Sequence, residues 1–474
     1  MPLPFATGRS GWTARVEVSL PMNYEHAVSR LYELGHELAR IPAQKFDIAH
    51  MRELAHAQGN PQNSFSSVLI AGTNGKGSTA ATLASILRAA GYRTGLYTSP
   101  HLVRINERIR INGEAIADED FTHAYARVSL VAQELVDGGR LPWMPSFFET
   151  MTAMAFEYFA HAGVQIAVLE VGMGGRLDAT NIVDPLISII TDIDLDHQKY
   201  LGDTIAEIAR EKAGILRKDR IAVTLPQHPQ ANDVIGRTMI EIGAQAVNAS
   251  RNVPPVSPGA GDLVKTEHGR THYRLSVLGE EIEIDSALTG RHQLRNLALA
   301  ITAAEELNQC GFAVSARQIA TGIREASWPG RFQVLPASGE RPEIVLDVAH
   351  NPAGAWALRS ALTDRYGDRP RVVVFGAMRD KAIRDIAQIL FPTAAKVIAT
   401  TTDHTPRAAS TEEIATIAGT VGIEVDQAEI VSLAVDAAVA CAREMKSSEG
   451  EPIVVITGSI YIVGSAMEAL RVTP

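Results

Sequence analysis

Short apolar runs alternate with amphipathic stretches along most of the chain, and this alternation predicts an α/β fold. Apolar runs of four to eight residues predict buried strands, and apolar positions every three or four residues predict helices. In the first part of the chain we expect strands at 67–71, 94–98, 164–171 and 186–193, and helices from residue 23, over 48–56, over 206–216 and over 293–309. Shorter alternating runs within 217–290 predict a small antiparallel appendage.

The pattern breaks at Trp328-Pro329-Gly330-Arg331 and then resumes. Beyond the break we expect strands at 343–347, 371–375, 396–400 and 453–457, and helices near 353–363, 381–390, 411–418 and 431–445. Strands that alternate with helices form mostly parallel sheets. We therefore predict an N-terminal extension over 1–21, a domain with a mostly parallel sheet over 22–328, a linker at 329–332 and a smaller Rossmann-like α/β domain over 333–474.

Composition and charge narrow the classes of protein that fit. The 474 residues include 44 Lys and Arg against 54 Asp and Glu, a net charge of −10, which argues against a general nucleic-acid binder. No run approaches the roughly 18 apolar residues of a membrane helix, and the first residues lack a secretory pattern. The two cysteines, Cys310 and Cys441, are too few for a disulfide framework. We expect a cytoplasmic protein without nucleic-acid or membrane partners.

A glycine-rich segment, residues 72–79 (Gly-Thr-Asn-Gly-Lys-Gly-Ser-Thr), follows the strand at 67–71 and precedes a helical pattern. The order of strand, glycine loop, lysine, hydroxyl and helix is typical of a phosphate-binding loop, although Gly77 is inserted before the usual hydroxyl position. Backbone N–H groups and the helix N-terminus would face phosphate oxygens, and Lys76 would add a cation. The alternative is a plain glycine turn.

This loop resembles the variant found in folylpolyglutamate synthases and dihydrofolate synthases, which are members of the Mur ligase superfamily. Further blocks of the family's pattern follow in the same order. They are residues 97–102 with 106–108, 169–181, 196–197, 200–202, 211–215, 292–293 with Asn296, 330–332, 347–352, and Gly376 with 380–381. The resemblance therefore covers nearly all of the chain beyond the extension, from about residue 24 to 465.

The resemblance implies a P-loop ATPase domain, a C-terminal glutamate-ligase domain and a cleft between them. It also implies that ATP phosphorylates a substrate carboxylate and that the amine of L-glutamate then displaces the phosphate. The acid would be dihydropteroate, a reduced folate or both, so the chain would serve folate biosynthesis and polyglutamylation in one-carbon metabolism. Phosphoryl transfer of this kind needs positioning and charge neutralisation more than covalent help. By analogy with relatives we expect a monomer.

The family's site positions carry over residue by residue. The positions for ATP are Thr73, Asn74, Gly75, Lys76, Gly77, Ser78, Asn296, Arg331 and Asp347. The family's magnesium ligands match Ser99, Glu170 and His197, with two Mg²⁺ ions expected and a monovalent cation as a further cofactor. Lys212 matches a lysine that is carbamylated in the family, and the catalytic candidates are Lys76, Lys212 and His350. The positions for the pterin acid are Asp47, Ile48, Ala49, Ser146, Phe148, Glu149, Leu177, Asp178 and Ala179.

Plainer roles stay open at five of these positions. Phe148 could be a core side chain, and Lys212 could lie on a solvated helix face. Arg331 could form an interdomain salt bridge, His197 could be a hydrogen-bonded loop histidine, and His350 could be a cap or turn residue.

Three other functions compete with the folate ligase. A Mur-type cell-wall precursor ligase would use the same chemistry on another acid, but such ligases carry an extra N-terminal domain, for which the residues before Gly72 leave little room. A P-loop switch would hydrolyse nucleotide without joining substrates, and no Asn-Lys-x-Asp guanine motif is evident. A non-catalytic folate-binding module would not need Lys76, Glu170 and His197 together.

Overall fold

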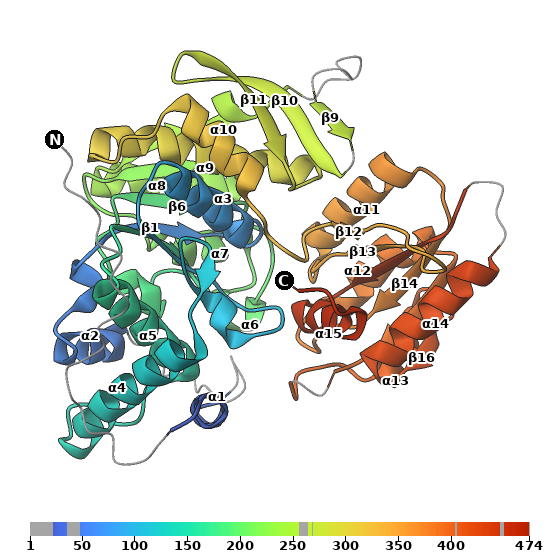
Figure 1. Cartoon of the computed structure of the whole chain (residues 1–474), viewed down its shortest axis with the longest axis horizontal. Coiled ribbons are helices and arrows are strands. Elements are labelled where there is room, and N and C mark those ends of the chain that lie inside the picture. Colours follow the sequence, from blue (N-terminus) through green and yellow to red (C-terminus); the bar gives the residue numbers. More distant parts are fainter. Residues whose placement is uncertain are drawn as a thin grey trace.

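The computed structural model describes residues 22–35, 48–255, 264–267, 269–402, 405–445 and 450–473. The chain forms two α/β units that lie side by side, the first built by residues before about 328 and the second by those after it (Figure 1). The predicted extension over 1–21 lies outside the described residues. Among the described residues, no helix combines the length and the apolar character needed to cross a membrane.

The first unit is built on an eight-stranded sheet with the strand order β4-β3-β2-β5-β1-β6-β7-β8. Its strands are β1 (Ser66–Ala71), β2 (Thr94–Tyr97), β3 (Ile109–Ile111), β4 (Glu114–Ala115), β5 (Ile166–Glu170), β6 (Ile187–Ile190), β7 (Ile221–Thr224) and β8 (Gln245–Asn248). The six strands from β2 to β8 in this order are parallel, and β3 and β4 extend one edge as antiparallel strands. This is the mostly parallel sheet that the sequence predicts.

Helices cover both faces of this sheet. One face packs on α1 (Tyr24–Glu33), α2 (Ile48–Ala57), α4 (Asp118–Asp137), α5 (Phe147–His161), α7 (Ile205–Ala213) and α8 (Pro229–Ile242). The other face packs on α3 (Lys76–Ala89), α9 (Arg291–Leu307) and α10 (Ala316–Glu325). Successive residues of β1 serve the two faces in turn, since Leu69 belongs to the first apolar cluster and Val68 to the second. Burial on both faces explains why the strands read as continuous apolar runs.

The antiparallel appendage is smaller than the sequence predicts. A three-stranded sheet with the order β11-β10-β9 contains only β9 (Val264–Glu267), β10 (Arg270–Val277) and β11 (Glu280–Ser286). The earlier part of the range 217–290 instead forms β7, α8 and β8, which add two parallel strands to the main sheet. Strand β8 is at the sheet edge and mostly exposed, so it has no apolar run that would indicate a buried strand.

The second unit is a six-stranded sheet with the order β12-β13-β17-β14-β15-β16. Its strands are β12 (Gln333–Leu335), β13 (Glu343–Leu346), β14 (Arg371–Phe375), β15 (Lys396–Thr400), β16 (Asp426–Ala428) and β17 (Ile453–Thr457). Only β12 is antiparallel to its neighbour. One face packs on α11 (Pro352–Tyr366), α12 (Ile383–Leu390) and α13 (Thr411–Thr420), and the other on α14 (Val431–Glu444) and α15 (Ile460–Leu470). This doubly covered sheet matches the predicted Rossmann-like unit.

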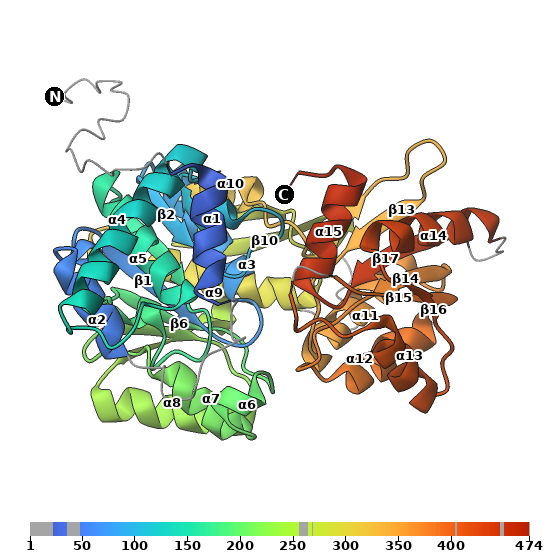
Figure 2. The ribbon, with the colours of Figure 1, turned by 90° about the horizontal axis from the view of Figure 1, so that it is seen from below.

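The two units face each other at the carboxyl ends of the first unit's central strands. The glycine loop follows β1, Ser99 follows β2, Glu170 ends β5, and Asp192 follows β6. From the second unit, α15 lies on the side that faces the first unit in both views (Figures 1 and 2). Open α/β sheets bind ligands at such carboxyl edges, so the fold gathers the predicted site residues there.

Candidate active site

A cavity of about 1020 Å³ lies at this edge and extends to the second unit. Nearly all of the predicted site residues line it, from the glycine loop and Asn296 to Arg331, Asp347 and His350. Asp47 lies outside the described residues. Of the predicted residues that the structure describes, Ala49 is exposed and not part of the lining, whereas Ile48 is. Neighbouring residues of a helix point in different directions, which explains why α2 directs Ile48 but not Ala49 into the cavity.

The glycine loop packs closely against Asn296 of α9 and against Trp328. Gly75 has a φ of 88°, and a Cβ at this position would lie 2.1 Å from Oδ1 of Asn296 on α9. A Cβ on Gly77 would lie 2.9 Å from Nε1 of Trp328. Asn296 is fixed in turn, because its amide donates to Oε1 of Gln293 at 2.8 Å. Glycine is therefore required at Gly75 both by backbone conformation and by space.

Two lysines meet behind this loop. Lys76 Nζ donates to the carbonyl oxygens of Gly72 at 3.1 Å and Thr73 at 3.2 Å. Lys212 Nζ, from α7, donates to the same Gly72 oxygen at 2.7 Å and is buried. Burial, together with the charge of Lys76, lowers the pKa of Lys212 from 10.5 to about 7. Burial rules out the reading of Lys212 as a lysine on a solvated helix face.

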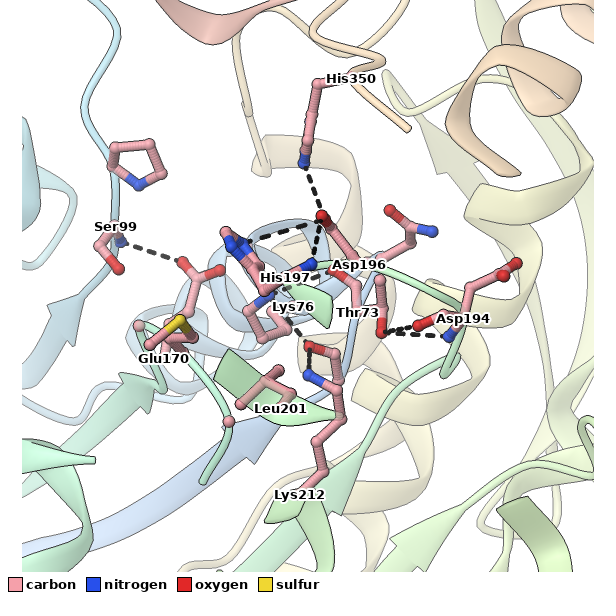
Figure 3. A pocket seen from close by; sticks show the side chains of 18 of the residues that line it. Thr73, Lys76, Ser99, Glu170, Asp194, Asp196, His197, Leu201, Lys212 and His350 are labelled. Atoms are coloured by element: carbon pink, nitrogen blue, oxygen red, sulfur yellow. Dashed lines mark hydrogen bonds and ion pairs between the residues drawn. The ribbon is translucent and has the colours of Figure 1, made fainter. Parts of the chain in front are cut away.

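Ser99, Glu170 and His197 lie around one region of the cavity (Figure 3). The backbone N–H of Ser99 donates to Oε2 of Glu170 at 3.2 Å. Burial raises the pKa of Glu170, and the nearby charge of Lys76 opposes this effect. His197 has a left-handed backbone, with φ at 52°, and its buried Nδ1 has no hydrogen-bond partner among the described residues. Burial lowers the pKa of His197 to about 3, so the ring is neutral near pH 7.

These three residues fit a divalent cation. A carboxylate, a hydroxyl and a neutral imidazole with an unpartnered nitrogen are donors that a metal can use. Within the described ranges, no group of three His, Cys, Asp or Glu side chains is arranged to hold a metal ion. A binding site here would therefore depend on oxygens from a bound substrate and water, as is usual for Mg²⁺ beside phosphates.

Asp196 connects the two units beside this region. Its carboxylate lies 2.6 Å from Nζ of Lys381, 3.5 Å from Nε2 of His350 and 3.4 Å from the amide nitrogen of Asn351. Burial alone would raise the pKa of Asp196, but the hydrogen bond from His350 and the charge of Lys381 outweigh it and hold the pKa well below its usual range. Asn351 also donates to Oδ1 of Asn74 at 3.0 Å, so the glycine loop itself contacts the second unit.

Arg331 and Asp347 lie where the chain passes into the second unit. Asp347 accepts hydrogen bonds from the backbone N–H groups of Phe332 at 2.8 Å and Ala349 at 2.9 Å, so it ties the segment before β12 to the turn after β13. Arg331 donates to the carbonyl of Gly330 at 3.3 Å and lines the cavity. Burial lowers the pKa of Arg331, although Asp347 and Glu170 oppose the effect. A half-buried guanidinium that lines a cavity is suited to receive an anion.

The residues predicted for the pterin acid include several that also build the scaffold. Ser146 and Glu149 form a capping box at the start of α5, since the Glu149 carboxylate accepts from the Ser146 N–H at 2.8 Å and the Ser146 hydroxyl receives the Glu149 N–H at 3.3 Å. Asp178 accepts the N–H groups of Met173 at 3.1 Å and Thr180 at 3.0 Å, and so shapes the loop after β5. Phe148 is half-buried and lines the cavity.

Some residues of the cavity were not assigned a role from the sequence. Asp196 and Lys381 line the cavity, and Asn351 contacts Asp196 beside it. All three belong to blocks that the family resemblance points to, but the sequence does not show that they meet. Arg295 holds Asp192 through two nitrogens, at 2.6 and 2.9 Å, and both side chains line the cavity. The sequence gives little indication that Arg295 and Asp192 form a pair, because the two residues are 103 positions apart.

Two domain models match the chain. The Mur ligase middle domain matches residues 146–304, and the Mur ligase glutamate ligase domain matches residues 330–460. Together with the glycine loop after β1 and the two-unit fold, these matches define the chain as a Mur ligase.

Individual relatives are similar over nearly the whole length. The dihydrofolate synthase/folylpolyglutamate synthase of Bacillus subtilis is 34% identical over 435 residues, which cover 90% of this chain and 95% of the relative. The solved Mycobacterium tuberculosis folylpolyglutamate synthase in complex with ADP has a TM-score of 0.85 at 31% identity and covers 95% of this chain and 98% of its own. FolC of E. coli, solved with DHPP and ADP, has a TM-score of 0.78 at 30% identity, with coverages of 95% and 98%. The chain belongs to the folylpolyglutamate synthase and dihydrofolate synthase family.

Proposed function

We propose that the protein is an ATP-dependent ligase that joins the amine of L-glutamate to the carboxyl group of dihydropteroate, of reduced folates, or of both. The observation that carries this proposal is that one cavity combines the glycine loop, most of the residues predicted for the pterin acid and the face of the second unit. Full-length similarity to folate ligases that were solved with ADP supports ATP as the phosphate donor.

The reaction needs two steps because a carboxylate is a poor electrophile. In the first step a carboxylate oxygen of the acid attacks the γ-phosphorus of ATP, and ADP leaves with the electron pair of the broken P–O bond. In the second step the glutamate amine attacks the acyl carbon, the C–O bond to phosphate breaks, and the amine loses a proton. The products are an amide, ADP and phosphate. Lys76 and the N–H groups of the loop would neutralise the transferred phosphate.

We further propose that Ser99, Glu170 and His197 hold Mg²⁺ and that a second ion, with a monovalent cation nearby, completes the site. Bound Mg²⁺ would supply positive charge that neutralises the phosphate being transferred. The orphaned Nδ1 of His197 and the buried Glu170 carboxylate support this assignment. Arg331, Asn296 and Asp347 would hold the nucleotide from the junction and α9.

Lys212 is proposed to carry a carbamate. Its depressed pKa leaves much of the amine neutral near pH 7, which addition of CO2 requires. The nitrogen forms a bond to carbon and releases a proton, so that the cation becomes an anion. That anion would lie behind the glycine loop, where it could neutralise Lys76 or a second Mg²⁺ ion.

The chain's organisation supports a hinged enzyme. We propose the limits 22–328 and 333–474 for the two domains, with 329–332 as the hinge between them. His350, which contacts Asp196 across the interface, would face substrate once the domains close. Neither a switch without ligase activity nor a cell-wall ligase is favoured, because the full-length relatives are folate ligases.

One assay tests the activity and the choice of acid. The protein is incubated with ATP, Mg²⁺ and L-glutamate, with dihydropteroate in one reaction and tetrahydrofolate in another, and the products are weighed by mass spectrometry. We expect a gain of one glutamate residue on at least one acid and ADP in equal amount. ATP hydrolysis without a new amide on either acid would contradict the proposal.

A further inference from the structure

The loop that joins β2 to β3, residues 98–108, reaches both the candidate site and the second unit. Near its start, the N–H of Ser99 contacts Glu170 at 3.2 Å. Three residues later, Leu102 and Val103 pack against the apolar cluster that α14, α15 and one face of the six-stranded sheet form. Three residues span at most about 11 Å. One short segment therefore carries both a predicted metal ligand and an interdomain contact.

Hydrogen bonds make this loop rigid. The carboxylate of Glu107 accepts the backbone N–H groups of Leu102 and Val103, each at 2.9 Å. The side chain of Arg108 is fully buried, and its Nε donates to Nδ1 of His101 at 2.9 Å. These hydrogen bonds connect the middle of the loop to its end. A displacement of Leu102 would therefore also displace the residues next to it in the loop.

Helix α15 contacts the loop at Gly464, a residue of the helix that has no side chain. A Cβ built on Gly464 would lie 2.0 Å from the carbonyl oxygen of Leu102, a distance no real carbon adopts. The same helix begins at the cavity, where Ser459 and Tyr461 are part of the lining. Figures 1 and 2 both show α15 at the junction of the two units. The helix backbone thus rests directly on the loop that carries Ser99.

We propose that Gly464 and Leu102 are positioning residues, whose contact sets the place of Ser99 in the metal and phosphate site. The site is then complete only while the second unit is docked on the loop. This inference rests on the proposed function, because the role of Ser99 belongs to it. A methyl group on Gly464 would have to displace Leu102 by about 1 Å, and a misplacement of that size can lower a rate about 100-fold.

The test measures metal binding as well as turnover. Mn²⁺, which accepts the same oxygen donors as Mg²⁺, is titrated into the ADP complex of each variant, and free Mn²⁺ is counted by electron paramagnetic resonance. We expect Gly464→Ala to bind Mn²⁺ at least tenfold more weakly than the original chain and to lose at least tenfold in kcat. Affinity for ADP without metal should change less than twofold.

Two control variants separate positioning from general damage. Gly419→Ala alters a glycine of α13 that has open space around its Cβ, and it should change nothing. Leu390→Ala removes a buried side chain from the opposite face of the second unit and should lower the unfolding temperature while Mn²⁺ affinity is kept. An equal loss of Mn²⁺ affinity in Leu390→Ala, or unchanged affinity in Gly464→Ala, would overturn the inference.

A second variant decides the question if Gly464→Ala does not fold. Leu102→Ala keeps the carbonyl that Gly464 touches but removes the side chain that packs on the apolar cluster of the second unit. We expect this loss of docking to weaken Mn²⁺ binding at least threefold; an unchanged affinity contradicts the proposal. The original chain is assayed for ligase turnover in parallel. If it joins glutamate to neither acid, the proposed function fails, whereas the Mn²⁺ titrations still test the contact itself.

Discussion

Lys76 and Lys212 donate hydrogen bonds to one and the same carbonyl oxygen, that of Gly72, at 3.1 and 2.7 Å. Two ammonium groups this close repel each other, and Lys212 is buried as well. Both effects favour loss of the proton from Lys212, so its pKa falls to about 7. A group with a pKa near neutral pH therefore lies directly behind the glycine loop.

The first prediction concerns this titration. Because the pKa of Lys212 lies near 7 and below its ordinary value of 10.5, the neutral amine is scarce at pH 6 and predominant at pH 8. We expect the carbamate signal from carbon-13 bicarbonate, followed by NMR, to rise across this interval with a midpoint near pH 7. Lys212→Arg keeps a positive charge but cannot form the carbamate, so it should show no signal and should lose at least 100-fold in kcat. A free amine in the active enzyme at pH 8 would refute the modification.

The second prediction concerns the ion pair of Asp196 and Lys381, whose side chains are 8% and 7% exposed. Removal of one member of a buried pair leaves an uncompensated charge, which costs about 3–5 kcal/mol. We expect Lys381→Met to lower either the free energy of unfolding of the second unit or the free energy of its docking on the first unit by about that amount. Urea denaturation measures this loss. A double-mutant cycle with Asp196→Asn should give a coupling of about 1–3 kcal/mol; additive effects would show that the pair does not join the units.

The third prediction concerns Arg331. The guanidinium is half-buried where the two units meet and lines the cavity, so its loss removes positive charge from the place where phosphate is expected. Arg331→Ala should lower kcat at least 100-fold, an effect of about 3 kcal/mol on the transition state. Arg443→Ala serves as the control, because that arginine pairs with Glu340 on the surface. Unchanged turnover in Arg331→Ala would remove the residue from the proposed nucleotide site.

The fourth prediction separates scaffold from substrate contact at the start of α5. Ser146 caps the helix, so Ser146→Ala should cost about 1 kcal/mol of stability and should raise the KM for the acid only modestly. Phe148→Ala removes a ring that lines the cavity and should raise the KM for the pterin acid at least tenfold while the KM for ATP stays within twofold. Equal effects on both KM values would mean that Phe148 only packs the core.

The sequence predicts the strands and helices of this fold best where strong apolar runs exist. The buried strands β5, β6, β14, β15 and β17 fall within the expected ranges, and β1 begins one residue before its range, because burial on both faces gives a continuous apolar signal. Helices α4, α5, α10 and α15 and the edge strands were not expected individually. Edge strands such as β8 and β16 are short and exposed, so they lack the apolar run by which a buried strand is predicted from sequence.

The candidate site was predictable to the extent that its residues stand in recognisable motifs. The glycine loop, Glu170 and His197 stand in such motifs, and the fold brings them to one cavity. Contacts made across long stretches of sequence were not predictable. Asp196 and Lys381 are 185 positions apart, and only the docking of the second unit brings their charges together. The structural role of Asp178 was also not predictable, because the sequence does not distinguish a carboxylate that caps a helix from one that binds a ligand.

The indole of Trp328 lies against the glycine loop, where its Nε1 would be 2.9 Å from a Cβ on Gly77 and has no hydrogen-bond partner among the described residues. Indole emission responds to nearby charge and to contact with water. A nucleotide that binds at Gly77 would change both the charge near the indole and its contact with water. The intrinsic fluorescence of Trp328 would therefore report nucleotide binding. Ligand arrival and release could then be followed by stopped-flow fluorescence without any attached dye, with Trp328→Phe as the blank.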